Sequence, residues 1–262
     1  MVTNKPAYVG SEYASRFKDP NMARAYLLRA PYPPETFQIL SSLLSGTPRS
    51  VLDVGCGTGE IARNLVDFAD SVDAVDFSDS MIELGRNLPG GNHRNLRWIV
   101  GKVEEIDLHP PYALITEGES LHWMDWDILF PLFRKILTMN GRLALVERKE
   151  DEELPWNDQL LKILDNYSTN PKYEQFDMAA DLEKSGLFQK QGELKTLPIT
   201  FVQSVEDYVE SFHSWSELSR IPMGKNASRF DADVKALVSG FTLGKPVERR
   251  VSSLIVWGKP RP

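Results

Sequence analysis

The chain has 262 residues and lacks the features that mark several classes of protein. Its one cysteine, Cys56, excludes a disulfide framework and a cluster of thiolate metal ligands, so no metal site is predicted. No apolar run approaches the length that spans a membrane, and Met1 to Gly10 has no apolar core of the kind found in secretion signals. We therefore expect a cytoplasmic protein with no membrane partner.

Basic residues are also few. Lys and Arg number 30 against 37 Asp and Glu, which gives a net charge of −7 with no basic run. We expect no nucleic-acid partner, because neutralising phosphates requires a basic face. The hydrophobic content of 42% is ordinary for a globular protein, and the length fits one elaborated domain over residues 1–262.

The most informative stretch reads S-V-L-D-V-G-C-G-T-G-E, from Ser50 to Glu60. Its apolar half is typical of a buried parallel strand, and three alternating glycines then lead into an amphipathic pattern from Ile61 to Phe68. A strand that turns through glycine into a helix brings backbone N–H groups to one point. Such a point favours a ligand with negative charge and hydroxyl groups.

Two acids strengthen this signal. Asp53 lies two residues before Gly55, where it can turn back and order the loop, and Asp76 ends the next predicted strand. A carboxylate at the position of Asp76 can accept hydrogen bonds from both hydroxyls of a ribose. The third glycine of the dinucleotide fingerprint is replaced by Glu60, which disfavours a nicotinamide cofactor.

The strings D-V-G-C-G-T-G-E and V-D-A-V-D-F-S-D-S-M-I resemble the cofactor-binding half of class I S-adenosylmethionine-dependent methyltransferases. The resemblance is specific over about residues 50–147. It implies an α/β fold with a doubly wound, mostly parallel, seven-stranded Rossmann-like sheet. It also implies S-adenosyl-L-methionine as the cofactor and a core for it over residues 50–150.

The cofactor-binding residues expected from the motifs and from this resemblance are Arg29, Asp53, Gly55, Cys56, Gly57, Asp76, Phe77, Met81, Val103, Glu104 and Glu117. Phe77 and Met81 would lie against the adenine ring, and an amide of Val103 or Glu104 would bind its edge. Glu117, with Glu119 at the same strand edge, would hold the methionine ammonium or bind a cationic or hydroxyl-rich substrate. Met81 as ordinary core and Glu117 as a solvated acid are the alternatives.

The segment before the glycine loop, residues 11–45, is expected to be a helical arm. Its string Y-x-x-R-A-P-Y-P-P resembles small-molecule methyltransferases of the trans-aconitate type, in which this arm folds over the cofactor. By that likeness Arg29 would clamp the cofactor carboxylate, while Tyr13 and Tyr26 would face the site. Helix-packing tyrosines and a solvated Arg29 are the alternative.

Acids and aromatic residues follow the fourth predicted strand, Tyr112 to Thr116, at an edge where open α/β sheets bind ligands. The string L-H-W in this loop resembles the same small-molecule group. Glu119 and His122 are the candidate general bases, and Trp123 is a candidate acceptor contact. The alternatives are a solvated Glu119 and a His122 packed for structure.

Beyond residue 155 the pattern becomes mostly helical to residue 240, with a strand expected over Leu197 to Val202 and a final strand over residues 249–258. The string S-W-S resembles a lid helix of the small-molecule group. His213 and Trp215 are therefore candidate acceptor contacts. Trp215 as a core anchor is the alternative.

The sequence thus predicts methyl transfer to a small-molecule acceptor by O-, C- or carboxyl-methylation. A nicotinamide-dependent oxidoreductase shares the strand, glycine loop and acid, and remains the second reading. A non-catalytic nucleoside-binding module of the same fold is the third. The acceptor and the oligomeric state are not fixed by the sequence.

Overall fold

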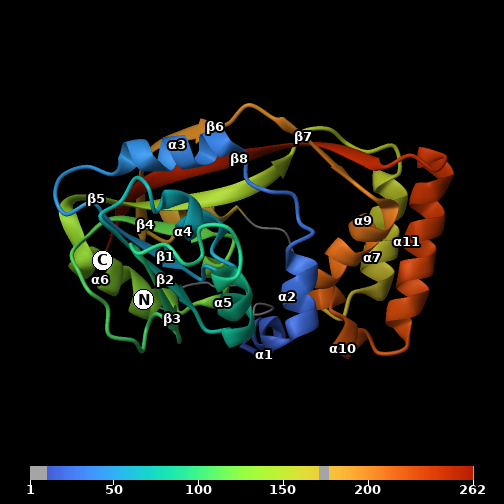
Figure 1. Ribbon diagram of the computed structural model, residues 1–262, viewed down its shortest axis with the longest axis horizontal. Coiled ribbons are helices and arrows are strands. Elements are labelled where there is room, and N and C mark those ends of the chain that lie inside the picture. Colours follow the sequence, from blue (N-terminus) through green and yellow to red (C-terminus); the bar gives the residue numbers. More distant parts are fainter. Residues whose placement is uncertain (1–10, 171–176, 262) are drawn as a thin grey trace.

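The computed structural model describes residues 11–170 and 177–261 (Figure 1). The α-helices are α1 (Ser11–Ser15), α2 (Pro20–Tyr26), α3 (Pro34–Leu43), α4 (Glu60–Leu65), α5 (Asp79–Arg86), α6 (Trp126–Ile136), α7 (Asn157–Tyr167), α8 (Met178–Lys184), α9 (Val205–Ser211), α10 (Arg220–Met223) and α11 (Asn226–Thr242). Short 3-10 turns are η1 (Arg16–Lys18), η2 (Leu121–Trp123), η3 (Phe212–Ser214) and η4 (Ser216–Leu218). The strands are β1 (Ser50–Val54), β2 (Ser71–Asp76), β3 (Leu96–Val100), β4 (Tyr112–Gly118), β5 (Leu137–Glu150), β6 (Phe188–Lys195), β7 (Ile199–Gln203) and β8 (Val247–Pro260).

The strands form one twisted sheet in the order β3-β2-β1-β4-β5-β8-β6, with β7 also paired to β8. The first five strands run parallel, and β8 runs antiparallel to β5, β6 and β7. The predicted mostly parallel, doubly wound α/β fold is confirmed. The sheet has eight strands rather than seven, because β6 and β7 share one edge of the long strand β8.

Helices cover both faces of the sheet. On one face α3 and α4 bury residues such as Phe37, Leu40 and Leu65 against β1 and β2. On the other face α6 buries Phe130 and Phe133 against β4 and β5. The parallel strands are apolar on both faces because each face is covered.

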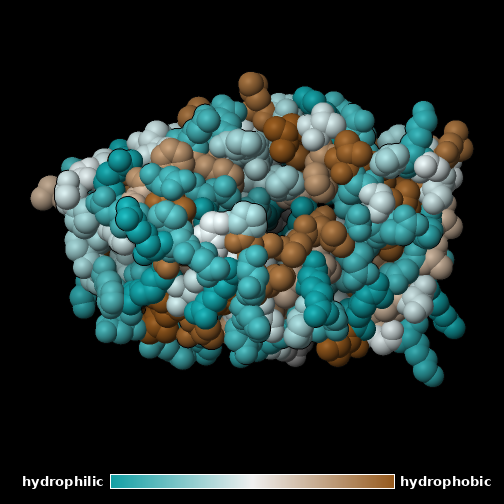
Figure 2. Space-filling view, in the orientation of Figure 1, coloured by the Kyte–Doolittle hydropathy of each residue, from teal (hydrophilic) through white to brown (hydrophobic). Residues whose placement is uncertain are grey.

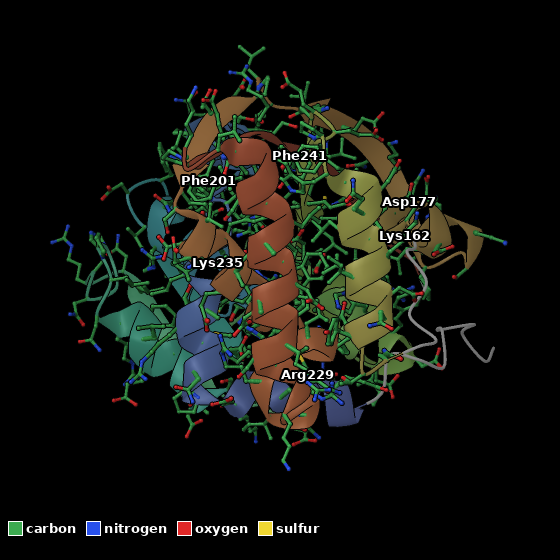
Figure 3. All side chains as sticks on the ribbon, turned by 90° about the vertical axis from the view of Figure 1, so that its right-hand side faces the viewer. Lys162, Asp177, Phe201, Arg229, Lys235 and Phe241 are labelled. Carbon is green, nitrogen blue, oxygen red and sulfur yellow. The ribbon has the colours of Figure 1, made fainter. Side chains whose placement is uncertain are left out.

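A third apolar cluster joins α7, α9 and α11 at one end of the molecule, on the right of Figure 1. Phe230 and Val234 of α11 are fully buried in it. Figure 3 shows α7 and α11 running side by side, with Lys162 of α7 and Lys235 of α11 at their surface. No helix among the described residues has the length and apolar character needed to cross a membrane.

The pattern from Asp127 to Met139, followed by Asn140 and Gly141, is typical of a helix with a stop signal, but the structure differs. Helix α6 ends at Ile136, and Gly141 lies inside β5. A Cβ on Gly141 would lie 2.8 Å from the carbonyl oxygen of Tyr112, so this glycine allows close strand approach rather than a helix stop.

Two further segments differ from their sequence patterns. The helical pattern over residues 11–30 is divided into α1, η1 and α2, because Pro20 begins α2 with Asp19 as its N-cap. Strand β6 was not predicted, although the neighbouring strand expected over Leu197 to Val202 is present as β7. Gly192 interrupts the β6 pattern and lies beneath the ring of Trp257, which would be 2.5 Å from a Cβ there.

Candidate functional site

The glycine loop between β1 and α4 has a conformation that requires glycine. Gly55, Gly57 and Gly59 have φ values of 62°, 55° and 72°. A Cβ on Gly55 would lie 2.5 Å from the Ser120 side chain, and a Cβ on Gly59 would lie 2.3 Å from the Trp98 ring. Both the backbone angles and the close neighbours therefore exclude side chains here.

The loop is fixed by its own amides. The N–H groups of Cys56 and Gly57 donate to the Val75 carbonyl and to Oδ2 of Asp76, and that of Gly59 donates to the Cys56 carbonyl. These three amides already have partners within the chain, and direct binding of a ligand by the loop amides stays a prediction. What Gly55 and Gly57 offer to the cavity beside them is close approach to the main chain.

Asp76 lies at the end of β2, is 7% exposed and lines that cavity. Its Oδ2 accepts from Gly57 N and its Oδ1 from Ser78 N, both at 2.8 Å. Burial raises the pKa of Asp76 to about 6 against the lowering effect of these bonds. Each oxygen has lone pairs left over, so the carboxylate can still accept two hydroxyl groups.

Asp53 orders the loop from below, as expected. Its Oδ1 accepts from the Thr116 hydroxyl at 2.8 Å and its Oδ2 from the Ala62 amide in the first turn of α4, at 3.1 Å. The carboxylate thereby joins β1, β4 and α4. Burial raises its pKa to about 7. Asp53 and Cys56 line a small cavity of about 20 Å³ behind the loop and not the larger one beside Asp76.

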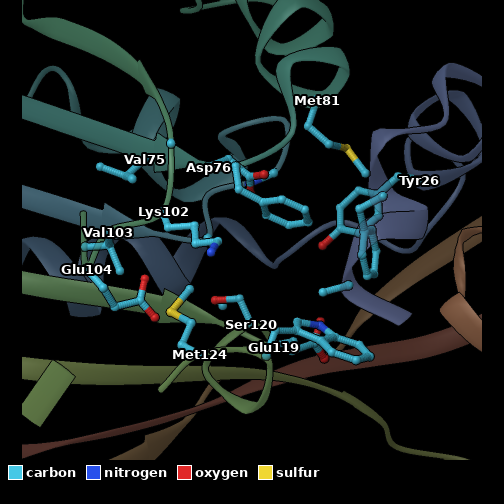
Figure 4. A pocket seen from close by; sticks show the side chains of 18 of the residues that line it. Tyr26, Val75, Asp76, Met81, Lys102, Val103, Glu104, Glu119, Ser120 and Met124 are labelled. Carbon is cyan, nitrogen blue, oxygen red and sulfur yellow. The ribbon is translucent and has the colours of Figure 1, made fainter. Parts of the chain in front are cut away.

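The cavity beside Asp76, here called the central cavity, has a volume of about 180 Å³ (Figure 4). In Figure 2 a hollow near the middle of the molecule has hydrophobic side chains beside it. The predicted residues that line the central cavity are Tyr26, Arg29, Gly55, Gly57, Asp76, Phe77, Met81, Val103, Glu104, Glu119 and Trp123.

Eight further lining residues were not predicted, namely Ala14, Phe17, Val75, Gly101, Lys102, Gly118, Ser120 and Met124. Lys102 and Ser120 lie next to predicted motifs, so proximity in sequence could have found them. Phe17 reaches the cavity from the arm, where it packs edge-on against Trp123 at 5.9 Å between ring centroids. That contact joins segments far apart in sequence and has no local signal.

Arg29 is held mainly by the helical region. Its Nε and Nη2 donate to the hydroxyl and carbonyl of Ser214, each at 2.7 Å, and its guanidinium stacks over Tyr26 at 4.2 Å. Only Nη1 has no bond to a described residue. The carboxylate clamp thus stays a prediction, with both N–H groups of Nη1 left for it.

Glu119 lies at φ 59°, in the left-handed region that side chains other than glycine seldom adopt. Its Oε2 pairs with Nη1 of Arg148 at 2.5 Å, and its Oε1 accepts from the Arg148 amide at 3.2 Å. Both carboxylate oxygens are therefore engaged by Arg148. The role of Glu119 as a general base stays a prediction.

Arg148 was missed by the sequence analysis. From β5 its Nη2 reaches Glu60 at 2.7 Å, its Nε reaches the Ala30 carbonyl at 2.8 Å, and its guanidinium stacks over Tyr32 at 3.8 Å. The side chain is 13% exposed. One buried cation therefore ties together the arm, the first turn of α4 and the loop after β4.

A second cavity of about 560 Å³ lies beyond Glu119 and contains Glu117, His122 and Trp215. Glu117, expected at the cofactor, lines this cavity and not the central one. Its Oε1 accepts from the amides of Ser120 and Leu121, and burial raises its pKa to about 7. His122 stacks on Trp123 with centroids 4.5 Å apart.

Tyr13 and His213 line none of the cavities found between described residues. His213 is 2% exposed, with its ring nitrogens 2.7 Å from the Leu218 carbonyl and 2.6 Å from Asp231. Tyr13 lies 4.4 Å beneath the Arg16 guanidinium. Trp215 is 39% exposed and is not a core anchor. In the described part of the chain, no three His, Cys, Asp or Glu side chains are grouped as metal ligands.

Residues 51–141 match a family model described as a methyltransferase domain. An uncharacterized methyltransferase of Mycobacterium tuberculosis is 33% identical over 138 residues, which are 52% of this chain and 54% of that protein. One of Schizosaccharomyces pombe is 27% identical over 74% of this chain and 76% of that protein. The chain spans about half the length of the first curated relatives it matches.

A malonyl-[acyl-carrier protein] O-methyltransferase of Halalkalibacterium halodurans is 35% identical over 30% of this chain and 31% of that protein. Among solved structures, a putative type II methyltransferase from Anaeromyxobacter dehalogenans aligns with a TM-score of 0.61 at 19% identity, covering 88% of this chain and 97% of the other. At that identity the likeness shows the shared fold.

Proposed function

We propose that the chain is a class I methyltransferase that transfers the methyl group of S-adenosylmethionine to a small-molecule acceptor, a proposal supported by the match of residues 51–141 to a methyltransferase domain. The observation that carries the proposal is Asp76, which lies buried at the end of β2 with lone pairs left for two hydroxyl groups. A nucleoside sugar presents two such hydroxyls side by side.

The central cavity suggests how the cofactor lies. The ribose is placed at Asp76, and the adenine between Phe77 and Met81 on one side and Val103 on the other. The methionine part extends past Gly55 and Gly57 towards Arg29. The activated methyl group then points to the loop after β4, where Glu119 and Trp123 line the cavity.

The bound sulfonium supplies an activated methyl group, so the chemical demand on the chain is modest. Its residues align the nucleophile with the C–S bond and exclude water. If the acceptor is a hydroxyl or an acidic carbon, a base is needed, and Glu119 and His122 stay the candidates. The ion pair of Glu119 with Arg148 favours His122 for that role.

Relatives support the acceptor class, and the chemistry of the site limits what is carried over from them. The likeness to trans-aconitate methyltransferases and the malonyl-[acyl-carrier protein] O-methyltransferase relative both favour small-molecule methylation. We do not carry over their substrates, because acids line the space beyond Glu119. We also propose action in the cytoplasm without a nucleic-acid partner, given the net charge of −7.

The test is turnover. The full chain is incubated with S-adenosylmethionine and a panel of small acids, phenols and amines, and S-adenosylhomocysteine is measured by mass spectrometry. Acceptor-dependent product is expected. A folded chain that binds S-adenosylhomocysteine but gives no turnover with any acceptor would favour the non-catalytic module.

A fluorescence titration with NADH separates the oxidoreductase reading. We expect no saturable binding, because Glu60 replaces the third glycine and is held by Arg148 and the Tyr32 amide. Tight NADH binding without S-adenosylhomocysteine binding would overturn the methyltransferase proposal.

A further inference from the structure

The second cavity, of about 560 Å³, lies next to the central cavity, with Glu119 lining both. Its walls come from the ends of β4 and β5, from β8, from the start of α8 and from Trp215. If the cofactor occupies the central cavity, a molecule here approaches it from the side of the loop after β4. The second cavity is thus placed to hold the acceptor, an argument that rests on the proposed function.

Glu117 places a carboxylate with spare acceptor capacity in the wall of this cavity. The side chain is 2% exposed, and the backbone amides of Ser120 and Leu121 both donate to its Oε1. Its Oε2 accepts from no described residue, yet it is not fully enclosed. An acceptor oxygen in such a largely enclosed place gains more from a charged donor than one at the surface does.

The charges around Glu117 favour a cation. Among the described residues, Arg148 and Lys149 are the lysine and arginine side chains that line the cavity, and both are already paired, Arg148 with Glu119 at 2.5 Å and Lys149 with Glu147 at 2.5 Å. The lining carboxylates also include Glu150, which pairs with Arg249 outside the cavity at 2.8 Å, and Asp177, which caps α8 (labelled in Figure 3). An anionic ligand would meet carboxylates without an unpaired lysine or arginine among the described lining residues to balance it.

The rest of the wall is apolar. Met178, Leu254 and Val256 line it together with the ring of Trp215, which is 39% exposed. An aromatic face beside a carboxylate suits an ammonium group on an apolar body, because both can contact the cation.

We infer that the second cavity is the acceptor site and that it takes a small organic amine with an apolar body, whose ammonium group donates to Oε2 of Glu117. A carboxylate of the same size is rejected. Glu117 then recognises the acceptor and does not hold the cofactor, although it adjoins the loop that faces both cavities.

The test compares two probes that share a phenol ring and differ in charge, tyramine and 4-hydroxyphenylacetate. Calorimetry is done on the full chain saturated with S-adenosylhomocysteine, so that the central cavity is filled. We expect tyramine to bind about ten-fold or more tightly than the acid, as one charge-assisted hydrogen bond predicts. The Glu117→Gln variant should lose most of this preference, because its amide oxygen can keep the bonds to Ser120 and Leu121 but its amide nitrogen cannot accept from the ammonium.

The matched control is Glu248→Gln, which changes the net charge equally at an exposed position on β8 outside the cavity. It should keep the preference of the wild type. Equal binding of the two probes, tighter binding of the acid, no binding of tyramine, or an unchanged preference in Glu117→Gln would each overturn the inference. The wild-type comparison stands even if that variant fails to fold. Failure of the wild type to bind S-adenosylhomocysteine would instead refute the proposed function.

Discussion

Arg148 offers the sharpest test of how the site is held together. Replacing it with methionine keeps much of the side-chain volume but removes the bonds to Glu60, Glu119 and the Ala30 carbonyl. The carboxylates of Glu60 and Glu119 would then lose their cation, although their side chains are only 24% and 27% exposed. Removing one partner of a buried ion pair costs about 3–5 kcal/mol.

Because both carboxylates keep some contact with water, the lower end applies, and we expect the free energy of unfolding to fall by about 3 kcal/mol. Urea denaturation followed by circular dichroism measures it. Arg148→Lys is the matched variant, since it keeps the charge but reaches fewer acceptors, and it should recover part of the loss. A loss below about 1 kcal/mol in Arg148→Met would show that the network is no more than a surface pairing and would refute the reasoning.

Two other substitutions test the glycine loop and Glu117. Gly59→Ala combines a φ of 72° with a Cβ placed 2.3 Å from Trp98, and it should lower the free energy of unfolding by about 3 kcal/mol. Gly186→Ala is the matched control, because Gly186 has a similar φ of 76° but no atom within 4 Å of its Cβ position. It should lower the free energy of unfolding by only about 1 kcal/mol. Equal losses in chemical denaturation would mean that the Trp98 contact is unimportant. In the folded protein, burial raises the pKa of Glu117 from an ordinary 4.5 to about 7. The contribution of this group to the free energy of unfolding is therefore present at low pH and is lost as the pH rises through 7. Glu117→Gln lacks this loss, so we expect its free energy of unfolding to rise by about 2 kcal/mol relative to that of the wild type between pH 5 and pH 8. Chemical denaturation at both pH values measures this change. A difference between the two proteins that is independent of pH would contradict the pKa assignment.

The cofactor side of the site was largely predictable, because its signals are local. The β1 strand, the glycine turn and Asp76 lie within 27 residues, and their residue types alone require a tight turn and a carboxylate at a strand end. Asp53 was also interpreted correctly, since its amide partner at Ala62 is only nine residues away.

The acceptor side was not predictable in the same way. Arg148 meets partners 29, 88 and 118 residues away, and no pattern within β5 indicates them. His213 and Arg29 are polar residues at plausible positions, yet tertiary contacts with Asp231 and Ser214 engage them. Glu117 and Glu119 lie two residues apart, but the left-handed turn at Glu119 sends their side chains to different neighbours, Ser120 and Arg148.

The most direct test of the central claim is calorimetric titration of S-adenosylhomocysteine into the wild type, Asp76→Asn and Asp79→Asn. Asp79 is the matched control, because it is exposed on α5 three residues away and lines no part of the central cavity. We predict that Asp76→Asn weakens binding by about 10- to 100-fold, since charged hydrogen bonds to the ribose are lost, while Asp79→Asn binds as the wild type does. Dissociation constants for Asp76→Asn and the wild type within about three-fold of each other would contradict the account.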